Sequence, residues 1–214
     1  MTNRQWAWVF ACVATVVLLG WYSPTAGSMM AAGLESLALR FNANYLAKAR
    51  AVGTALASCL QSSPDLAWGA MMAIARRESS FEPAAANPRS SARGIYQVLA
   101  PYMADYGVSE STVMDLTANV QGVSAALQRN VIPVMQRMIP QCWDDYYFYT
   151  AALYAGLHEG AAGLRGICAA AGAEDATITV EDFLAAMDVP LAAIMRIVAA
   201  DAGYWEDHRE ELLA

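Results

Sequence analysis

Residues 73–98 read AIARRESSFEPAAANPRSSARGIYQV, and this stretch carries the strongest indication of the fold. A helix is predicted to end near Glu78, because residues 83–93 are rich in Pro, Ala, Asn and Ser and predict a loop. At the carboxyl end of a helix the dipole disfavours a second negative charge, and apolar neighbours such as Ile74 and Phe81 act in the same direction. Both effects raise the pKa of a carboxyl group, and a carboxyl group that is protonated near neutral pH can act as a general acid. The alternative is a surface glutamate paired with arginine.

The order of residue types along this part of the chain resembles the lytic transglycosylase family, with its soluble-lytic-transglycosylase-like (goose-lysozyme-like) catalytic domain. Residues 78–83 (ESSFEP) resemble the family motif Glu-Ser-x-Phe-x-Pro, and residues 92–97 (ARGIYQ) resemble Ala-Arg-Gly-Leu-Met-Gln. Two weaker matches follow. Residues 119–122 (NVQG) are similar to Asn-Ile-x-x-Gly, and residues 151–156 (AALYAG) are similar to Ala-Ala-Tyr-Asn-Ala-Gly. Together the matches extend over residues 60–166.

This resemblance implies cleavage of the β-1,4 bond between N-acetylmuramic acid and N-acetylglucosamine in peptidoglycan, with a 1,6-anhydro product and without addition of water. Glu78 would protonate the leaving oxygen and then act as a base on the 6-hydroxyl of the muramic acid. Ser80 and Gln97 would line the sugar site through hydrogen bonds, and Gly94 would permit a close backbone turn beside the cleft. Neither a cofactor nor a metal ion is implied.

Tyr154 departs from the last of these motifs, Ala-Ala-Tyr-Asn-Ala-Gly, which we call the third family motif because the first two matches form one signature around the glutamate. It stands where the family has asparagine, and Leu153 stands where the family has tyrosine. A shift of one position turns a side chain by about 100° around a helix, so Tyr154 either faces the cleft or packs in the core. The aromatic run at 146–149 has the same two interpretations, a sugar-stacking wall or ordinary packing. His158 lacks the second histidine of a zinc-protease helix, and we interpret it as a helix end.

A second carboxyl group would change the expected chemistry, because ordinary glycosidases use two carboxyl groups at a set separation. Glu82 is expected to face solvent. If Asp105, Asp144 or Asp145 faces Glu78, a lysozyme-type hydrolysis is the alternative.

The N-terminal part of the chain predicts a membrane or export segment, because residues 5–34 contain no charged side chain. A helix over 6–22 would span about 25 Å, which is marginal for a hydrocarbon core of about 30 Å. Aromatic residues at both ends of this run favour an uncleaved anchor, whereas small residues at 26–28 fit cleavage of a signal peptide. Arg4 precedes the run, which predicts a cytoplasmic N-terminus and a body outside the cytoplasm.

Composition excludes several classes of protein. With 57% hydrophobic and 15% charged residues the chain is not intrinsically disordered, and a net charge of −7 excludes a basic nucleic-acid surface. Abundant alanine and few β-branched residues predict an all-α fold. The family resemblance implies that this is a lysozyme-like helical domain, and the uncharged run adds an N-terminal hydrophobic (transmembrane or signal) helix. The expected organisation is a signal anchor or signal peptide (1–28), an amphipathic segment (29–60), the transglycosylase domain (61–172) and a helical extension (173–214).

Spacing and capping residues place the expected helices more closely. They are predicted over 30–60, 63–79, 101–106, 117–127, 143–157, 160–171 and 190–213, with Thr117 as the cap of the fourth. A further helix is expected to start at Thr179, where Asp182 would complete a variant capping box. Pro133 should bend or end a helix. Of the cysteines after the N-terminal run, Cys142 and Cys168 are the favoured disulfide pair, and three free buried thiols including Cys59 are the alternative.

Location and partners follow from the resemblance and the N-terminal run together. They imply peptidoglycan glycan strands as the substrate and a periplasmic protein, anchored in the inner membrane or exported. Local opening of the wall would suit a phage particle during genome entry, or a bacterial conjugation or secretion machine. A rival from another class is a structural or channel-forming subunit of a membrane or virion with a degenerate lysozyme-like domain. The altered third motif favours this rival, and the retained order of Glu78, Ser80, Gly94 and Gln97 disfavours it.

Overall fold

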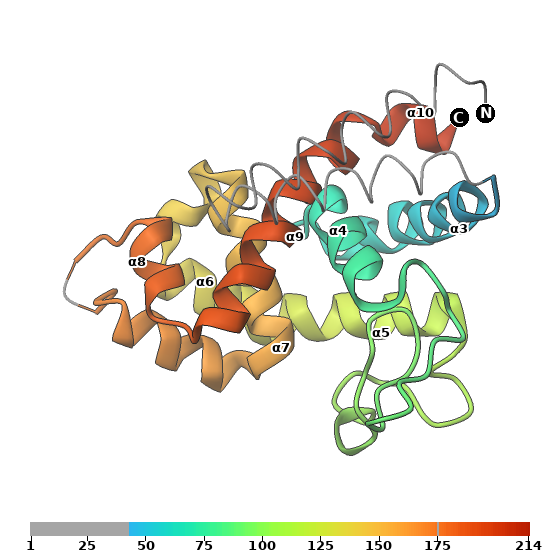
Figure 1. Cartoon of the computed structure of the whole chain (residues 1–214), viewed down its shortest axis with the longest axis horizontal. Coiled ribbons are helices and arrows are strands. Elements are labelled where there is room, and N and C mark those ends of the chain that lie inside the picture. The colour runs from blue at the N-terminus through green and yellow to red at the C-terminus, as the bar shows by residue number, and fades with distance from the viewer. Residues whose placement is uncertain (1–42, 175) are drawn as a thin grey trace, which may run out of the picture. The chain divides into compact units, whose positions relative to one another are not determined.

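Helix α4 (Trp68–Ser79) is a mostly buried helix that packs against two longer helices. The computed structural model describes residues 43–174 and 176–214, and residues from Lys48 onward form one compact unit, to which this description refers. Within it α4 packs along α9 (Val189–Asp207), and α9 also packs along α7 (Tyr146–Ala170) (Figure 1). Residues 68–75 of α4 are all buried, so this helix forms the centre of the core.

The remaining elements are short helices and turns. The α-helices are α3 (Ala43–Cys59), α5 (Leu116–Ala126), α6 (Ile132–Met138), α8 (Val180–Ala185) and α10 (Arg209–Leu213). The 3₁₀ helices are η1 (Leu60–Ser62), η2 (Ala100–Tyr102) and η4 (Pro140–Asp144), and η3 (Leu127–Val131) is a π-helix. Over the described ranges there is no strand, and two isolated bridges join Arg93 to Ala86 and Val98. The prediction of an all-helical body is therefore confirmed for the described part of the chain.

The sequence predicted the presence of these helices correctly, but it misplaced the first residue or the cap of two of them. The helix expected from residue 63 begins at Trp68, because Tyr149 holds the preceding residues in a turn. The Tyr149 hydroxyl donates to the carbonyl oxygen of Asp65 at 2.6 Å and accepts from the N–H of Ala67 at 3.1 Å. At the next helix Asp115 is the cap in place of Thr117, and its carboxylate accepts from the N–H of Ala118 at 2.8 Å.

Two predicted helices are one element with a kink. The helices predicted over 143–157 and 160–171 correspond to the single helix α7, which begins after the capping residue Asp145 and bends at Gly160. Gly160 has φ 71° and ψ 175°, a backbone conformation that is essentially restricted to glycine. Near the C-terminus one predicted helix is instead two elements, because the helix expected over 190–213 is interrupted at His208. The predicted capping box of Thr179 and Asp182 is confirmed.

The long helix expected to bend near Pro133 changes its winding just before that residue. The π-helix η3 separates α5 from α6, and Pro133 lies in the first turn of α6. Proline is tolerated there because the first N–H groups of a helix have no intrahelical acceptor.

The three described cysteines, Cys59, Cys142 and Cys168, are buried free thiols. The favoured Cys142–Cys168 disulfide is therefore wrong, and the alternative of free thiols holds. Burial raises the pKa of Cys142 to about 12 and that of Cys168 to about 11, so both are inert at neutral pH.

Within residues 43–174 and 176–214, no helix is both long and apolar enough to cross a membrane. The predicted anchor over 6–22, and residues 30–42 of the expected 30–60 helix, lie outside the described residues. The domain limits set from the sequence stay predictions.

Candidate active site

Glu78 lies in the last turn of α4 and lines a cavity of about 300 Å³. Its side chain is half-buried. The cavity is also lined by side chains from the loop after α4 and from α7, among them Gln97, Tyr102, Tyr106, Tyr154 and His158. The structure thus brings three of the five predicted site residues, Glu78, Gln97 and Tyr154, to one cavity.

The chain turns sharply directly after Glu78. Ser80 and Phe81 both have left-handed backbone conformations, with φ 52° and 62°. The N–H of Ser80 donates to the carbonyl oxygen of Arg76 at 2.8 Å and closes the helix end. Phe81 is fully buried, and its ring packs edge-on against Trp205 at 5.2 Å. Consecutive left-handed residues other than glycine are costly, and buried Phe81 holds this turn in place.

Ser80 is placed differently from the prediction. Its side chain is exposed, and it is not among the residues that line the Glu78 cavity. Because its position is the C-cap of α4, the visible role of Ser80 is to end the helix behind Glu78.

Gln97 is held in the cavity by a tight turn that begins at Gly94. The N–H of Gln97 donates to the carbonyl oxygen of Gly94 at 3.1 Å, and its side-chain Nε2 donates to the same oxygen at 2.9 Å. Nε2 also lies 3.3 Å from the carbonyl oxygen of Ala85, on the loop that follows α4. Gly94 itself is buried with φ 80° and does not line the cavity, so it shapes the turn from behind, as a close backbone turn requires.

The motif at residues 119–122 supports this turn. Asn119 in α5 is fully buried, and its Oδ1 accepts from the N–H of Tyr96 at 3.3 Å. Its Nδ2 donates to the carbonyl oxygen of Val113 at 2.8 Å. The Tyr96 hydroxyl donates to the carbonyl oxygen of Met71 in α4 at 3.2 Å. These bonds fix the Gln97 turn relative to the helix that carries Glu78.

Tyr154 faces the cavity, which decides between its two predicted orientations. Its hydroxyl donates a hydrogen bond to Oε1 of Glu78. The ring of His158 stands edge-on to Tyr154 with 6.3 Å between centroids. Both side chains come from α7, one helical turn apart, and both line the cavity.

Burial raises the pKa of Glu78 above the ordinary carboxyl value. The Tyr154 hydrogen bond is the largest opposing effect, and the electrostatic effects of His158 and then of Arg77 also lower the pKa of Glu78. Arg76 points away and pairs with Asp201 in α9 at 2.5 Å. The predicted direction of the shift is confirmed, with removal of the carboxyl group from water as its main cause.

No candidate for a second carboxyl group reaches Glu78. Glu82 is partly exposed, as predicted, but it pairs with Lys48 at 2.5 Å, which lowers the pKa of Glu82. Asp145 caps α7, and neither Asp105 nor Asp144 lines the Glu78 cavity. Among the described residues that line it, Glu78 alone carries a carboxylate.

Sequence reasoning missed His158, Tyr102 and Tyr106 as residues of the cavity. The sequence could have indicated His158, because it lies four residues after Tyr154 and this spacing puts both side chains on one face of a helix. The aromatic run at 146–149 turns away from Glu78, so the packing interpretation is correct. For example, Tyr147 donates to the carbonyl oxygen of Arg196, and Phe148 packs on Phe183 at 5.3 Å.

A helical body with a half-buried glutamate at the end of its central helix is typical of lysozyme-like domains. The particular family indicated is the transglycosylase SLT domain, whose family model matches residues 59–157. The resemblance inferred from the motifs is thereby confirmed. This family supports a lytic-transglycosylase type of activity on peptidoglycan. No curated protein and no solved structure matches the chain.

Proposed function

We propose that the protein is a peptidoglycan lytic transglycosylase in which Glu78 is the single acid and base. The observation that carries this proposal is the Tyr154–Glu78 hydrogen bond, in a cavity where Glu78 is the one carboxylate among the described lining residues. A glycosidase that activates water needs a second carboxyl group. A reaction in which the sugar supplies its own nucleophile needs only one.

In the first step Glu78 acts as an acid. Its raised pKa keeps a larger fraction protonated near neutral pH. The Tyr154 hydroxyl occupies Oε1, so Oε2 is the oxygen that donates the proton to the glycosidic oxygen. The bond between that oxygen and C1 of the muramic acid then breaks, and C1 becomes electron-poor.

In the second step the Glu78 carboxylate acts as a base. It takes the proton of the 6-hydroxyl of the same muramic acid, and the oxygen forms a bond to C1. The proton returns to Glu78, no water is consumed, and the products are a free N-acetylglucosamine 4-hydroxyl and a 1,6-anhydro end. Tyr154 stabilises the carboxylate that exists between the two steps.

Replacing Tyr154 by phenylalanine is expected to lower the rate by about 10- to 100-fold, because a hydrogen bond to a charged group contributes about 1.5–3 kcal/mol. The loss of this donor raises the pKa of Glu78 further, so the fall in rate at high pH moves to higher pH. The measurement is the pH–rate profile of peptidoglycan solubilisation. Tyr147→Phe is the matched control on the same helix, since its hydroxyl donates to Arg196 outside the cavity. An unshifted profile in Tyr154→Phe would show that Tyr154 does not act on Glu78.

Product analysis tests the proposed reaction. Purified peptidoglycan is digested with the full-length chain, and the ends of the released fragments are identified by mass. Anhydro-muramyl ends support the proposal, whereas hydrated reducing ends would show a lysozyme-type hydrolase. Inactivity of both the wild type and Glu78→Gln would favour the structural-subunit alternative. That alternative is supported by the departure of Leu153 and Tyr154 from the family motif.

We also propose that the body of the protein works in the periplasm, attached to the inner membrane through residues 6–22 or exported. The support is the uncharged N-terminal sequence alone. Opening of the wall for a phage particle or for a secretion or conjugation assembly would suit such a protein. N-terminal sequencing of the membrane fraction tests the anchor, and a mature protein that begins near Gly27 or Ser28 contradicts it.

A further inference from the structure

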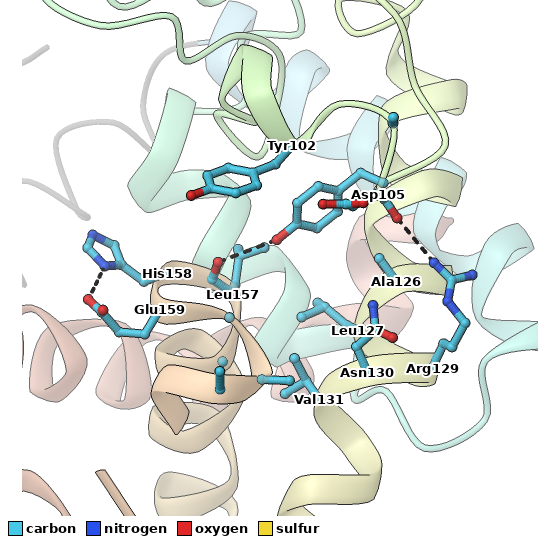
Figure 2. Close-up of a pocket in the computed structure, with 16 residues that line it drawn as sticks. Tyr102, Asp105, Ala126, Leu127, Arg129, Asn130, Val131, Leu157, His158 and Glu159 are labelled. Atoms are coloured by element: carbon cyan, nitrogen blue, oxygen red, sulfur yellow. Dashed lines mark hydrogen bonds and ion pairs between the residues drawn. The ribbon is translucent and has the colours of Figure 1, made fainter. Parts of the chain in front are cut away.

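A second cavity, of about 660 Å³ (Figure 2), adjoins the Glu78 cavity, because the two have lining residues in common. The two cavities share four lining residues, Tyr102, Tyr106, Leu157 and His158. A ligand that occupies one cavity therefore reaches the boundary of the other. The chemistry proposed for Glu78 makes no use of the larger cavity.

The walls of the larger cavity are built from two unusual backbone segments. One is the π-helix η3, from which Leu127, Arg129, Asn130 and Val131 line the cavity. The other is the kink of α7, where Gly160 has its glycine-only conformation. A Cβ atom on Gly160 would meet nothing within 4 Å, so packing does not explain the glycine. Because π-helices and strained backbone cluster at functional sites, their meeting at one cavity points to a binding site.

The cavity carries both signs of charge. The Arg129 guanidinium stands on one side and donates through Nη2 to the backbone oxygen of Asp105 at 3.1 Å (Figure 2). The Asp105 carboxylate lines the same cavity. On the other side His158 Nδ1 lies 2.9 Å from Glu159 Oε1. A guanidinium has five N–H donors, so Arg129 can hold the backbone and still bind a carboxylate.

We propose that this cavity binds the stem peptide of peptidoglycan, a short peptide with free carboxylates and a free amino group. The inference rests on the proposed function. The peptide is attached to the muramic acid whose bond Glu78 would break, so it must leave the Glu78 cavity nearby. Arg129 would bind a peptide carboxylate, and Asp105 or Glu159 would bind the ammonium group. A neutral sugar would leave these charges unused.

Direct binding tests the site without turnover. The probe is a synthetic stem tetrapeptide that contains diaminopimelate, titrated into full-length Glu78→Gln by calorimetry. Saturable binding is expected, and adding Arg129→Gln should weaken it about tenfold, as loss of one charge-assisted hydrogen bond predicts. Adding Arg137→Gln is the matched control, since Arg137 is exposed on α6 and lines neither cavity. Absence of binding, or equal binding with and without Arg129, would overturn the proposal.

A substrate comparison separates peptide from sugar recognition. Intact peptidoglycan and glycan strands stripped of peptide by an amidase are digested in parallel. The wild type should prefer the intact substrate, and Arg129→Gln should lose about tenfold more on intact than on stripped strands. Ala162→Phe is a second variant, because Ala162 is an exposed wall residue whose enlargement narrows the cavity. Equal losses on both substrates would show that the cavity binds sugar, against the proposal.

The two proposals can fail separately. If the wild type cleaves neither substrate but the tetrapeptide binds in an Arg129-dependent way, the transglycosylase function is wrong and the peptide site stands. If both substrates are cleaved at the same rate and no tetrapeptide binds, the peptide site is wrong and the enzymatic function stands. Thermal melts of each variant exclude unfolding as the cause of a loss.

Discussion

Glu78→Gln is expected to abolish detectable solubilisation of purified peptidoglycan, with a rate loss of at least about 10²–10⁴-fold, the usual contribution of a general acid or base. Glutamine has the size and the acceptor oxygen of glutamate, so the Tyr154 hydroxyl retains a partner. It has no proton to donate and cannot act as a base, so both proposed steps are lost. The measurement is release of soluble fragments over time, with the ends identified by mass.

The same variant should be more stable than the wild type at neutral pH. The pKa of Glu78 is raised in the folded state, so the unfolded state loses its proton more readily as the pH rises. The contribution of this group to stability is complete below the ordinary carboxyl pKa of about 4.3 and is lost as the pH rises through the raised value. Glutamine does not ionise. The melting temperature of Glu78→Gln should therefore exceed that of the wild type at about pH 7, with a smaller difference at about pH 4.

Glu82→Gln is the matched control, because Glu82 is the next carboxylate along the chain and lies outside the cavity. It should retain activity. Its pKa is lowered by the Lys48 pair, so the sign of its effect on stability is reversed, with a loss of at most about 1 kcal/mol near neutral pH for such a partly exposed pair. A rate loss in Glu82→Gln equal to that in Glu78→Gln would contradict the assignment of Glu78 as the single acid and base.

Gly94→Ala should have the largest effect on stability, a loss of about 3 kcal/mol or more from backbone strain and overpacking together. Gly94 has φ 80°, which an L side chain rarely adopts. A Cβ atom would lie 2.2 Å from the carbonyl oxygen of Val113 and 2.4 Å from Nδ2 of Asn119. Neither neighbour can move without breaking the hydrogen bond between them. Chemical denaturation of the wild type and the variant measures the difference.

Gly107→Ala separates the two causes of this loss. Gly107 has a similar φ of 65°, but a Cβ atom there would meet nothing within 4 Å. Its cost should be limited to the left-handed backbone, about 1–2 kcal/mol. The excess loss in Gly94→Ala then measures the close approach of the Gln97 turn to Asn119. Equal losses in the two variants would show that this close approach contributes nothing.

Local sequence signals predicted several features correctly. Alanine-rich helical spacing predicted a body of helices, and the ESSFEP and ARGIYQ motifs selected Glu78 and Gln97. The Thr179 capping box was also predicted, because its hydrogen bonds join residues three positions apart. These features depend on neighbours along the chain, so they can be read without knowledge of the fold.

Other features depend on contacts between residues far apart in sequence, and the sequence left them open or predicted them wrongly. Tyr149 sets the start of α4 through Asp65 and Ala67, which are more than 80 residues away. The orientation of Tyr154 follows from how α7 packs, and a rotation of about 100° would have turned it into the core. The segment 173–214 lies outside the motif resemblance, yet α9 packs on α4 and its Asp201 holds Arg76 away from Glu78.

The identity of the acid was thus encoded in a short motif, whereas its environment was not. Burial, the Tyr154 hydrogen bond and the neighbouring His158 arise only when α4 and α7 come together. The pKa of a carboxyl group depends on the water and charges around it in space, and adjacent residues along the chain supply only part of these.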